Sequence, residues 1–283
     1  MMAAKALSPD MVGTEFEPAT VSWNDKDVML YALGVGARPS ADLDFIYEGR
    51  GPKVLPTFAV IPGMRAMGSI NKVVELPIAR MLHGEQGITL HRPLPPRGEL
   101  TMTSRISEIW DKGKAAVIGV TADFSDAEGI IFSTHSTLFW IGGGGFGGES
   151  GPSTRDLNQP PDRAPDHEVR DVTREEQGAI YRLSGDRVAL HIDPEFARKA
   201  GYDKPFMHGL CTYGFVGRAV LHELCGNDPA NFVSLEGRFS ERVEFEDEII
   251  TRIWVEEPGN AIVQAVTQDG KVAVSQARAR YRA

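Results

Sequence analysis

The sequence predicts an α+β fold in which one helix packed against a curved antiparallel sheet occurs twice in the chain. Alternating apolar and polar residues, the pattern of half-buried strands, run through the later part of each half. Each half also carries one strong helix candidate ahead of those runs. The halves match at a nearly constant spacing: YALGVGA at 31–37 corresponds to YRLSGDR at 181–187, and Pro56 corresponds to Pro205.

The expected elements follow the same order in both halves. The first half has a helix around 56–70, followed by strands at 100–110, 114–124 and 129–141. The second half has a helix around 208–225, followed by strands at 249–257, 261–269 and 271–282. Since a half-buried strand turns one face to the core, each set of strands is expected to cover its own helix.

A segment rich in glycine and proline separates the halves. It starts as GGGGFGG at 142–148 and continues as ESGPSTRDLNQPPDRAPDHE at 149–168. Gly142, Gly144 and Gly147 satisfy GxGxxG, but a nucleotide-binding loop must open a helix, and this one opens a proline-rich run. We therefore expect a flexible linker, 149–168, between an N-terminal repeat, 1–148, and a C-terminal repeat, 169–283.

The composition restricts the functional class. A net charge of -9 argues against a nucleic-acid partner, because nucleic-acid binders are more often basic. The two cysteines, Cys211 and Cys225, lack metal or redox spacing, so a reducing compartment is expected. The sequence shows neither a signal-peptide pattern nor an apolar run long enough for a membrane span, which predicts a cytoplasmic protein.

The stretch YRLSGDRVALHIDP at 181–194 contains the main candidate site. Its SGD sequence predicts a tight turn that presents Asp186. His191 follows just before a short helix, for which Asp193 is a plausible N-cap. A carboxylate and an imidazole held close together can divide general acid and base work across one water molecule.

The start of the second long helix supplies a third group. Gly209 opens this helix, and its backbone N–H has no acceptor within the helix, so it can stabilise an oxyanion. With Asp186 and His191, it fits the addition of water across an alkene conjugated to a thioester. On spacing alone, a turn aspartate and a packed histidine explain the same residues, so that alternative stays open. The absence of HExxH, a Cys/His cluster and GxSxG disfavours a metal site and a serine hydrolase.

The two repeats differ where this chemistry would lie. Gly36 corresponds to Asp186, and Ala59 corresponds to His208. The first repeat is therefore expected to hold a degenerate site, whose space can accept the tail of an acyl ligand.

Two motifs of the second half resemble a known enzyme family. YRLSGDRVALHIDPEFA followed by PFMHGLCTYGF resembles the signature of the (R)-specific enoyl-CoA hydratases, the hydratase 2 or MaoC-like dehydratase family. The first half adds YALGVGA, DLDFIYEG, LPTF, MLHGEQ, RPLPPRG and DKG, which are similar to the hydratase 2 domain of peroxisomal multifunctional enzyme type 2. The resemblance implies a double hot-dog fold. It also implies hydration of a trans-2-enoyl-CoA to a (3R)-3-hydroxyacyl-CoA in acyl-CoA β-oxidation.

The resemblance also implies a role for each matching residue. Asp186 and His191 match the catalytic pair, and Gly209 matches the oxyanion donor. The other matches are substrate contacts at Glu48, His83, Gly84, Lys112, Arg187, Val188 and Phe239, and supporting residues at Tyr181, Asp193 and His208. No metal or separate cofactor is implied, because coenzyme A is part of the substrate.

The signature departs from the family at two positions. The family reads GDxNPLH where this chain reads GDRVALH, so Val188 replaces an asparagine and Ala189 a proline. Losing the asparagine removes a hydrogen-bond donor and acceptor beside the water. This departure motivates an alternative, a non-catalytic acyl-CoA-binding or partner subunit.

Two further points stay open in the sequence. The same site running in reverse would make a 3-hydroxyacyl-thioester dehydratase of lipid synthesis. The acyl group is either a fatty acyl chain or a bulky sterol side chain. A homodimer is expected, since proteins of this double hot-dog family often dimerise.

Overall fold

A ten-stranded antiparallel sheet is the frame of the computed structural model, which describes residues 7–77, 80–154 and 156–283. The strand order is β1-β3-β4-β5-β2-β7-β10-β9-β8-β6, so the second half repeats the order of the first from the opposite edge. The strands are β1 Glu15–Trp23, β2 Met81–Leu90, β3 Gly98–Asp111, β4 Ala115–Asp126, β5 Gly129–Ile141, β6 His167–Val172, β7 Phe232–Phe239, β8 Glu248–Glu257, β9 Asn260–Thr267 and β10 Val272–Tyr281.

The predicted alternation is clear in β3, whereas β8 and β9 bury consecutive residues. In β3, Leu100 and Met102 are buried, whereas Glu99 and Thr101 are exposed. The six strands expected from the sequence correspond to β3, β4, β5, β8, β9 and β10. Strands β2 and β7 pair at the centre of the sheet and so join the two repeats.

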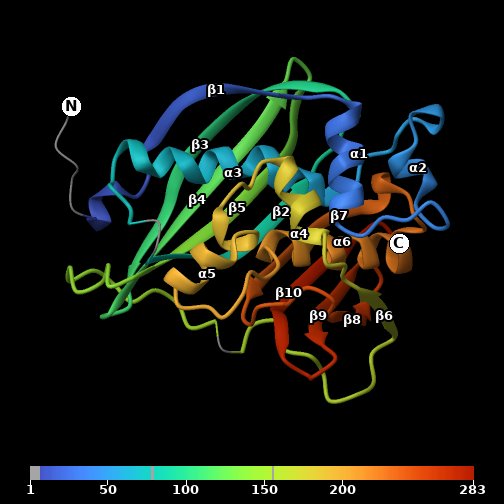
Figure 1. Ribbon diagram of the computed structural model, residues 1–283. Helices are drawn as coiled ribbons and strands as arrows, with labels where there is room; N and C mark the ends of the chain where they lie inside the picture. The colour runs from blue at the N-terminus through green and yellow to red at the C-terminus, as the bar shows by residue number, and fades with distance from the viewer. Residues whose placement is uncertain (1–6, 78–79, 155) are drawn as a thin grey trace.

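Two helical segments lie on the same face of the sheet (Figure 1). One runs from the 3-10 turn η3 Pro56–Ala59 through α3 Val60–Gly68 to η4 Ser69–Lys72, and the other is α6 Gly209–Cys225. Both confirm the predicted helices. The remaining α-helices of the described residues are α1 Asp25–Gly34, α2 Leu43–Ile46, α4 Gln177–Tyr181 and α5 Pro194–Lys199. Among the described helices, none is both long enough and apolar enough to cross a membrane.

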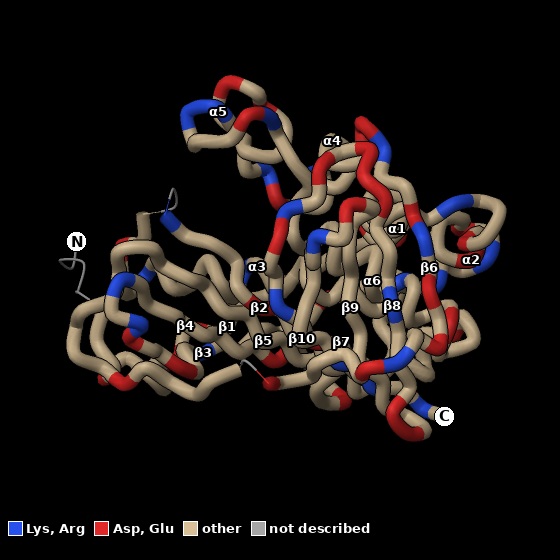
Figure 2. The backbone as a smooth tube through the Cα atoms, turned by 90° about the horizontal axis from the view of Figure 1, so that it is seen from below, with Lys and Arg blue, Asp and Glu red and all other residues tan. Residues whose placement is uncertain are grey.

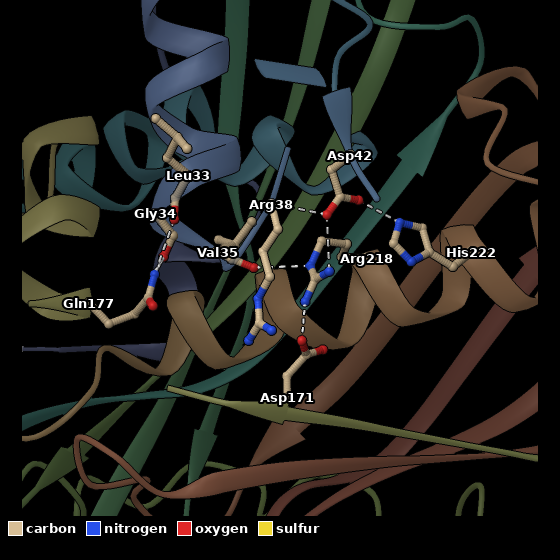
Figure 3. Close-up of polar contacts among 9 residues, drawn as sticks. All are labelled: Leu33, Gly34, Val35, Arg38, Asp42, Asp171, Gln177, Arg218 and His222. Carbon is tan, nitrogen blue, oxygen red and sulfur yellow. Dashed lines mark hydrogen bonds and ion pairs between the residues drawn. The ribbon is translucent and has the colours of Figure 1, made fainter. Parts of the chain in front are cut away.

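Side chains of the second repeat cap the end of α1 (Figure 3). The Gln177 amide donates to the carbonyl oxygens of Leu33 and Gly34, at 3.2 and 2.5 Å. Arg218 Nε, on α6, donates to the Val35 carbonyl oxygen at 3.2 Å. The last carbonyls of a helix lack intrahelical donors, so these bonds tie α1 of one repeat to α4 and α6 of the other.

Arg218 also belongs to a buried charge cluster (Figure 3). Its guanidinium lies 3.3 Å from Asp42 and 2.5 Å from Asp171, and His222 Nε2 lies 2.7 Å from Asp42. Burial alone would raise the pKa of Asp42, but the His222 hydrogen bond, the Arg38 amide and the Arg218 charge lower it overall. The carboxylate of Asp42 therefore stays ionised and links α6 to the first repeat.

Hydrogen bonds hold the segment between the repeats against β10. Asn158 Nδ2 donates to the Gln276 carbonyl oxygen at 3.0 Å, and Gln276 Nε2 donates to the Thr154 carbonyl oxygen at 2.7 Å. Strand β6 starts at His167, inside the predicted 149–168 linker. The expected flexible linker is therefore bound at several points. The boundaries of the two repeats stay a prediction.

Candidate active site

A cavity of about 1410 Å³ is lined by residues of both repeats. It exceeds the roughly 300–1000 Å³ of common small-ligand pockets, so it can hold a long ligand. The candidate residues that line it are Asp186, His191, Gly209, His83, Gly84, Lys112 and Phe239.

Asp186 is presented by a turn that favours glycine. Gly185 follows η6 Arg182–Ser184 with a φ of 143°, a conformation that residues with side chains rarely adopt. The Val188 amide donates to Asp186 Oδ1 at 3.3 Å. The predicted SGD turn is thus present, and it brings the carboxylate to the cavity.

His191 is the last residue of η7 Ala189–His191. A backbone contact defines the tautomer of its ring. Its Nδ1 lies 2.8 Å from the Phe206 carbonyl oxygen. A carbonyl only accepts, so Nδ1 carries a proton, and in the neutral ring Nε2 keeps its lone pair. Burial lowers the pKa of His191, against the opposing effects of the Phe206 carbonyl and the Asp186 charge. The neutral ring can therefore act as a general base through Nε2.

The ring of His208 packs against the ring of His191. The two ring centroids lie 3.9 Å apart with planes at 32°, and the Tyr181 ring centroid lies 5.0 Å from that of His208. His208 Nε2 donates to the Asp186 carbonyl oxygen at 3.2 Å. Burial, together with the nearby His191, lowers the pKa of His208 to about 3. Tyr181 and His208 do not line the cavity, and their supporting roles stay predictions.

The N-terminus of α6 meets the cavity at Gly209. The first N–H groups of this 17-residue helix lack intrahelical acceptors and lie at the positive end of its dipole. A Cβ on Gly209 would lie 3.3 Å from the Phe239 ring, so glycine allows Phe239 to pack over the helix start. This end of the helix can stabilise negative charge that develops on a carbonyl oxygen.

Strand β2 brings His83 and Gly84 to the cavity at a bulge, where its register with β5 shifts. A Cβ on Gly84 would lie 2.9 Å from Thr137 Oγ1, closer than side chains normally approach. The His83 ring lies 5.0 Å from the Phe239 ring, and burial lowers the pKa of His83 to about 4. These residues form an uncharged wall facing the start of α6.

The remaining predicted residues lie outside the cavity lining. Glu48 is exposed in η2 Glu48–Arg50, Arg187 is exposed, and Val188 is 42% exposed. Their substrate contacts stay predictions that the cavity does not support. Asp193 accepts hydrogen bonds from the first amides of α5, as expected of an N-cap. Figure 2 shows α5 projecting from the rest of the molecule.

The site also contains three atoms that could share a metal ion. One ligand atom each from Asp186, His191 and His208 lies within 4.8 Å of the other two. Zinc ligation requires the imidazole lone pairs to converge on one point. His191 Nδ1 and His208 Nε2 instead donate to backbone carbonyl oxygens, so each ring offers only its other nitrogen, and we interpret the arrangement as one that binds water.

Several basic residues of the cavity were not singled out in the sequence. Arg238, Arg242 and Lys271 line it together with Lys112. The Arg242 guanidinium lies over the rings of Tyr202 and Phe206, 5.4 and 5.7 Å from their centroids. Arg238 and Arg242 lie on and just after β7, whereas Lys271 lies just before β10, and the pairing of these two strands brings them together. No local sequence pattern predicts this grouping.

A helical segment on each half of one antiparallel sheet, with a cavity at the start of α6, is the arrangement of the double hot-dog fold. A Mycobacterium tuberculosis protein described as a double hot-dog fold superposes with a TM-score of 0.61 at 13% identity, over 96% of both chains. The MaoC-like dehydratase from Phytophthora capsici superposes with a TM-score of 0.85 at 32% identity, over 97% of this chain and 98% of that one.

The family is shown by the sequence matches. The MFE-2 hydratase 2 N-terminal domain matches residues 21–142, and the MaoC like domain matches residues 156–278. The chain therefore belongs to the MaoC-like hydratase 2 family, which confirms the resemblance. It is 44% identical to 3-hydroxyacyl-thioester dehydratase Y of Mycobacterium tuberculosis, over 91% of this chain and 90% of that protein. It is 39% identical to peroxisomal multifunctional enzyme type 2 of Mus musculus, over 94% of this chain and 37% of that longer protein.

Proposed function

We propose that this protein adds water to a trans-2-enoyl-CoA and forms a (3R)-3-hydroxyacyl-CoA in acyl-CoA β-oxidation. The observation that carries the proposal is the meeting of Asp186, the Nε2 side of a neutral His191 and the start of α6 at one cavity. The family supports it as well: probable enoyl-CoA hydratase 2 of Dictyostelium discoideum is 36% identical over 94% of this chain and 93% of that protein.

One water held between Asp186 and His191 Nε2 supplies both the hydroxyl group on the β-carbon and the hydrogen on the α-carbon. Its oxygen attacks the β-carbon while one of its protons passes to this pair. The electrons of the double bond move toward the thioester, whose oxygen gains negative charge that the Gly209 N–H stabilises. The pair then returns a proton to the α-carbon, so one water is consumed and the protein ends unchanged.

The same groups catalyse the reverse loss of water from a 3-hydroxyacyl thioester. That direction is named in the relative 3-hydroxyacyl-thioester dehydratase Y. Lys112, Arg238 and Lys271 favour a carrier with phosphate groups, which both CoA and acyl-carrier protein provide.

A non-catalytic acyl-CoA-binding subunit is the second candidate, favoured by Val188 at the family asparagine. Three catalytic groups around one cavity support the enzyme over the binding subunit. The sterol acyl group, the cytoplasmic location, the homodimer and the lack of a separate cofactor stay predictions.

The proposal is tested with purified protein and trans-2-enoyl-CoAs that carry short, long and steroid-like acyl groups. Hydration is followed by loss of the conjugated-thioester absorbance, and the product is assigned by chiral analysis. Formation of the R product from at least one member is the expected result. If the protein binds acyl-CoA tightly but hydrates no member of the panel, the hydratase proposal is wrong, and the protein is a non-catalytic acyl-CoA-binding subunit.

A further inference from the structure

The glycine-rich segment after β5 wraps around a carboxylate of the protein itself. Asp111, the last residue of β3, is 8% exposed. Its Oδ1 accepts hydrogen bonds from the amides of Gly113 and Gly145, and its Oδ2 from that of Gly147, each at 2.8 Å. The Gly145 bond, with the other backbone bonds, lowers the pKa of Asp111. The GxGxxG run thus does bind an anion, but the anion is Asp111.

Backbone geometry explains why this segment is rich in glycine. We call residues 142–154 the strap. Gly142, Gly145 and Gly147 have φ values of 84°, 84° and 81°, which residues with side chains rarely adopt. A Cβ on Gly144 would lie 2.3 Å from the Ala115 carbonyl oxygen. The glycines therefore serve a tight fit around Asp111 rather than flexibility.

Beyond its glycines, the strap leads into the cavity. The Asp111 amide donates to the Glu149 carbonyl oxygen at 2.7 Å, and Lys112 Nζ donates to the Ser150 carbonyl oxygen. Residues 152–154 then line the cavity. Its far end is held as well, because Gln276 donates to the Thr154 carbonyl oxygen. One carboxylate thus fastens the near end of a segment that forms part of the cavity wall.

We propose that Asp111 is a positioning residue for substrate binding, which places Lys112 and residues 152–154 where the CoA part of the thioester enters. The proposal rests on the proposed function for the identity of the ligand. Asp111 itself does not line the cavity, and the strap contains none of the catalytic groups. Loss of the carboxylate should therefore weaken binding of CoA and leave the chemical step unchanged.

The test compares Asp111→Asn with the unaltered protein. Asparagine keeps the shape but replaces one acceptor oxygen by an NH₂ group, which faces a backbone N–H. We expect KM for a trans-2-enoyl-CoA to rise about tenfold or more, with kcat within about twofold. The N-acetylcysteamine thioester of the same acyl group lacks the nucleotide and phosphates, so both proteins should turn it over equally. Asp126→Asn is the matched control: this carboxylate also accepts a backbone amide, from Glu128 at 2.8 Å, on a hairpin outside the cavity.

A second pair of variants changes a glycine of the strap instead of Asp111. Gly147 and Gly13 have φ values of 81° and 85°, and a Cβ on either would meet nothing within 4 Å. Alanine therefore introduces similar backbone strain at both positions. Gly147→Ala should raise KM for the enoyl-CoA in the manner of Asp111→Asn, whereas Gly13→Ala should leave KM unchanged.

Hydrogen exchange and binding of CoA separate this proposal from the proposed function. The peptide containing Gly145 and Gly147 should exchange faster in Asp111→Asn, and the Kd for CoA alone should rise about tenfold. Unchanged exchange and an unchanged Kd would overturn the strap proposal even if the protein is an active hydratase. A fall in kcat at constant KM would overturn it as well. If the unaltered protein hydrates no enoyl-CoA, the proposed function fails, and exchange and CoA binding still decide the role of Asp111.

Discussion

The imidazole rings of His191 and His208 lie close together beside Asp186, with centroids 3.9 Å apart and planes tilted by 32°. Each ring donates one N–H to a backbone carbonyl, His191 to Phe206 and His208 to Asp186. A proton added to either buried ring would place a cation against the other ring. Burial lowers the pKa of both rings, and the nearby His191 lowers that of His208 further, so both imidazoles stay neutral and Nε2 of His191 is left as the base of the site.

Replacing His191 by glutamine should remove that base. We expect kcat to fall by about 10²–10⁴-fold, because general-base catalysis contributes this much. Circular dichroism should show an unchanged fold. His91→Gln, at a histidine that contacts Ser133 Oγ at 3.2 Å, is the control and should keep full activity. A His191→Gln protein with an unaltered kcat would exclude His191 as the base.

Acid should destabilise the protein through His208. Its folded pKa of about 3 lies below the ordinary 6.5, so the unfolded chain binds more protons between these values. The free energy of unfolding then falls as the pH drops below 6.5, by about 2 kcal/mol on reaching about pH 5. His208→Gln should lose about that much less over the same interval. Urea unfolding at pH 7 and pH 5 measures the difference, and equal losses in both proteins would contradict the assignment.

Arg218→Met should lower the free energy of unfolding by about 3–5 kcal/mol, because it removes the guanidinium that pairs with the buried Asp42 and the partly buried Asp171. Arg218 is 6% exposed in its side chain and Asp42 is fully buried. The double variant Arg218→Met with Asp42→Asn should recover part of the loss. Arg170→Met is the control, since that side chain is 52% exposed in its ion pairs and should cost at most about 1 kcal/mol. Similar urea midpoints for both single variants would argue against the buried cluster as a link between the repeats.

Turnover should survive removal of metal ions. The proposed reaction relies on proton transfer by Asp186 and His191, and one nitrogen of each of the two rings already donates to a backbone carbonyl oxygen. Dialysis against EDTA is expected to leave kcat unchanged. Loss of activity that added Zn²⁺ restores would instead assign Asp186, His191 and His208 to a metal centre.

Local patterns predicted the parts of the fold that depend on neighbouring residues. Alternation identified β3. The SGD turn, the Asp193 cap and the start of α6 at Gly209 follow from short-range preferences. These elements carry the candidate catalytic groups. The resemblance to the family assigned a role to each of these groups.

Long-range contacts account for what the sequence did not predict. At Gly84, β2 forms a bulge next to Thr137. The bulge interrupts the alternation of apolar and polar residues by which a strand is predicted. The partner of His191 is a backbone carbonyl, at Phe206, which no residue type reveals. GGGGFGG resembled a flexible link because its partner, Asp111, lies about thirty residues earlier and meets it only in the folded sheet.

The most direct test of the account compares turnover of a trans-2-enoyl-CoA by Asp186→Asn and Asp193→Asn. Both aspartates lie in the same motif, but Asp186 lines the cavity and Asp193 only caps α5. Asp186→Asn should lower kcat by about 10²-fold or more while acyl-CoA still binds. Asp193→Asn should keep kcat and lose at most about 1 kcal/mol of stability. Equal turnover by Asp186→Asn and the unaltered protein would contradict the central claim that Asp186 and His191 activate the water.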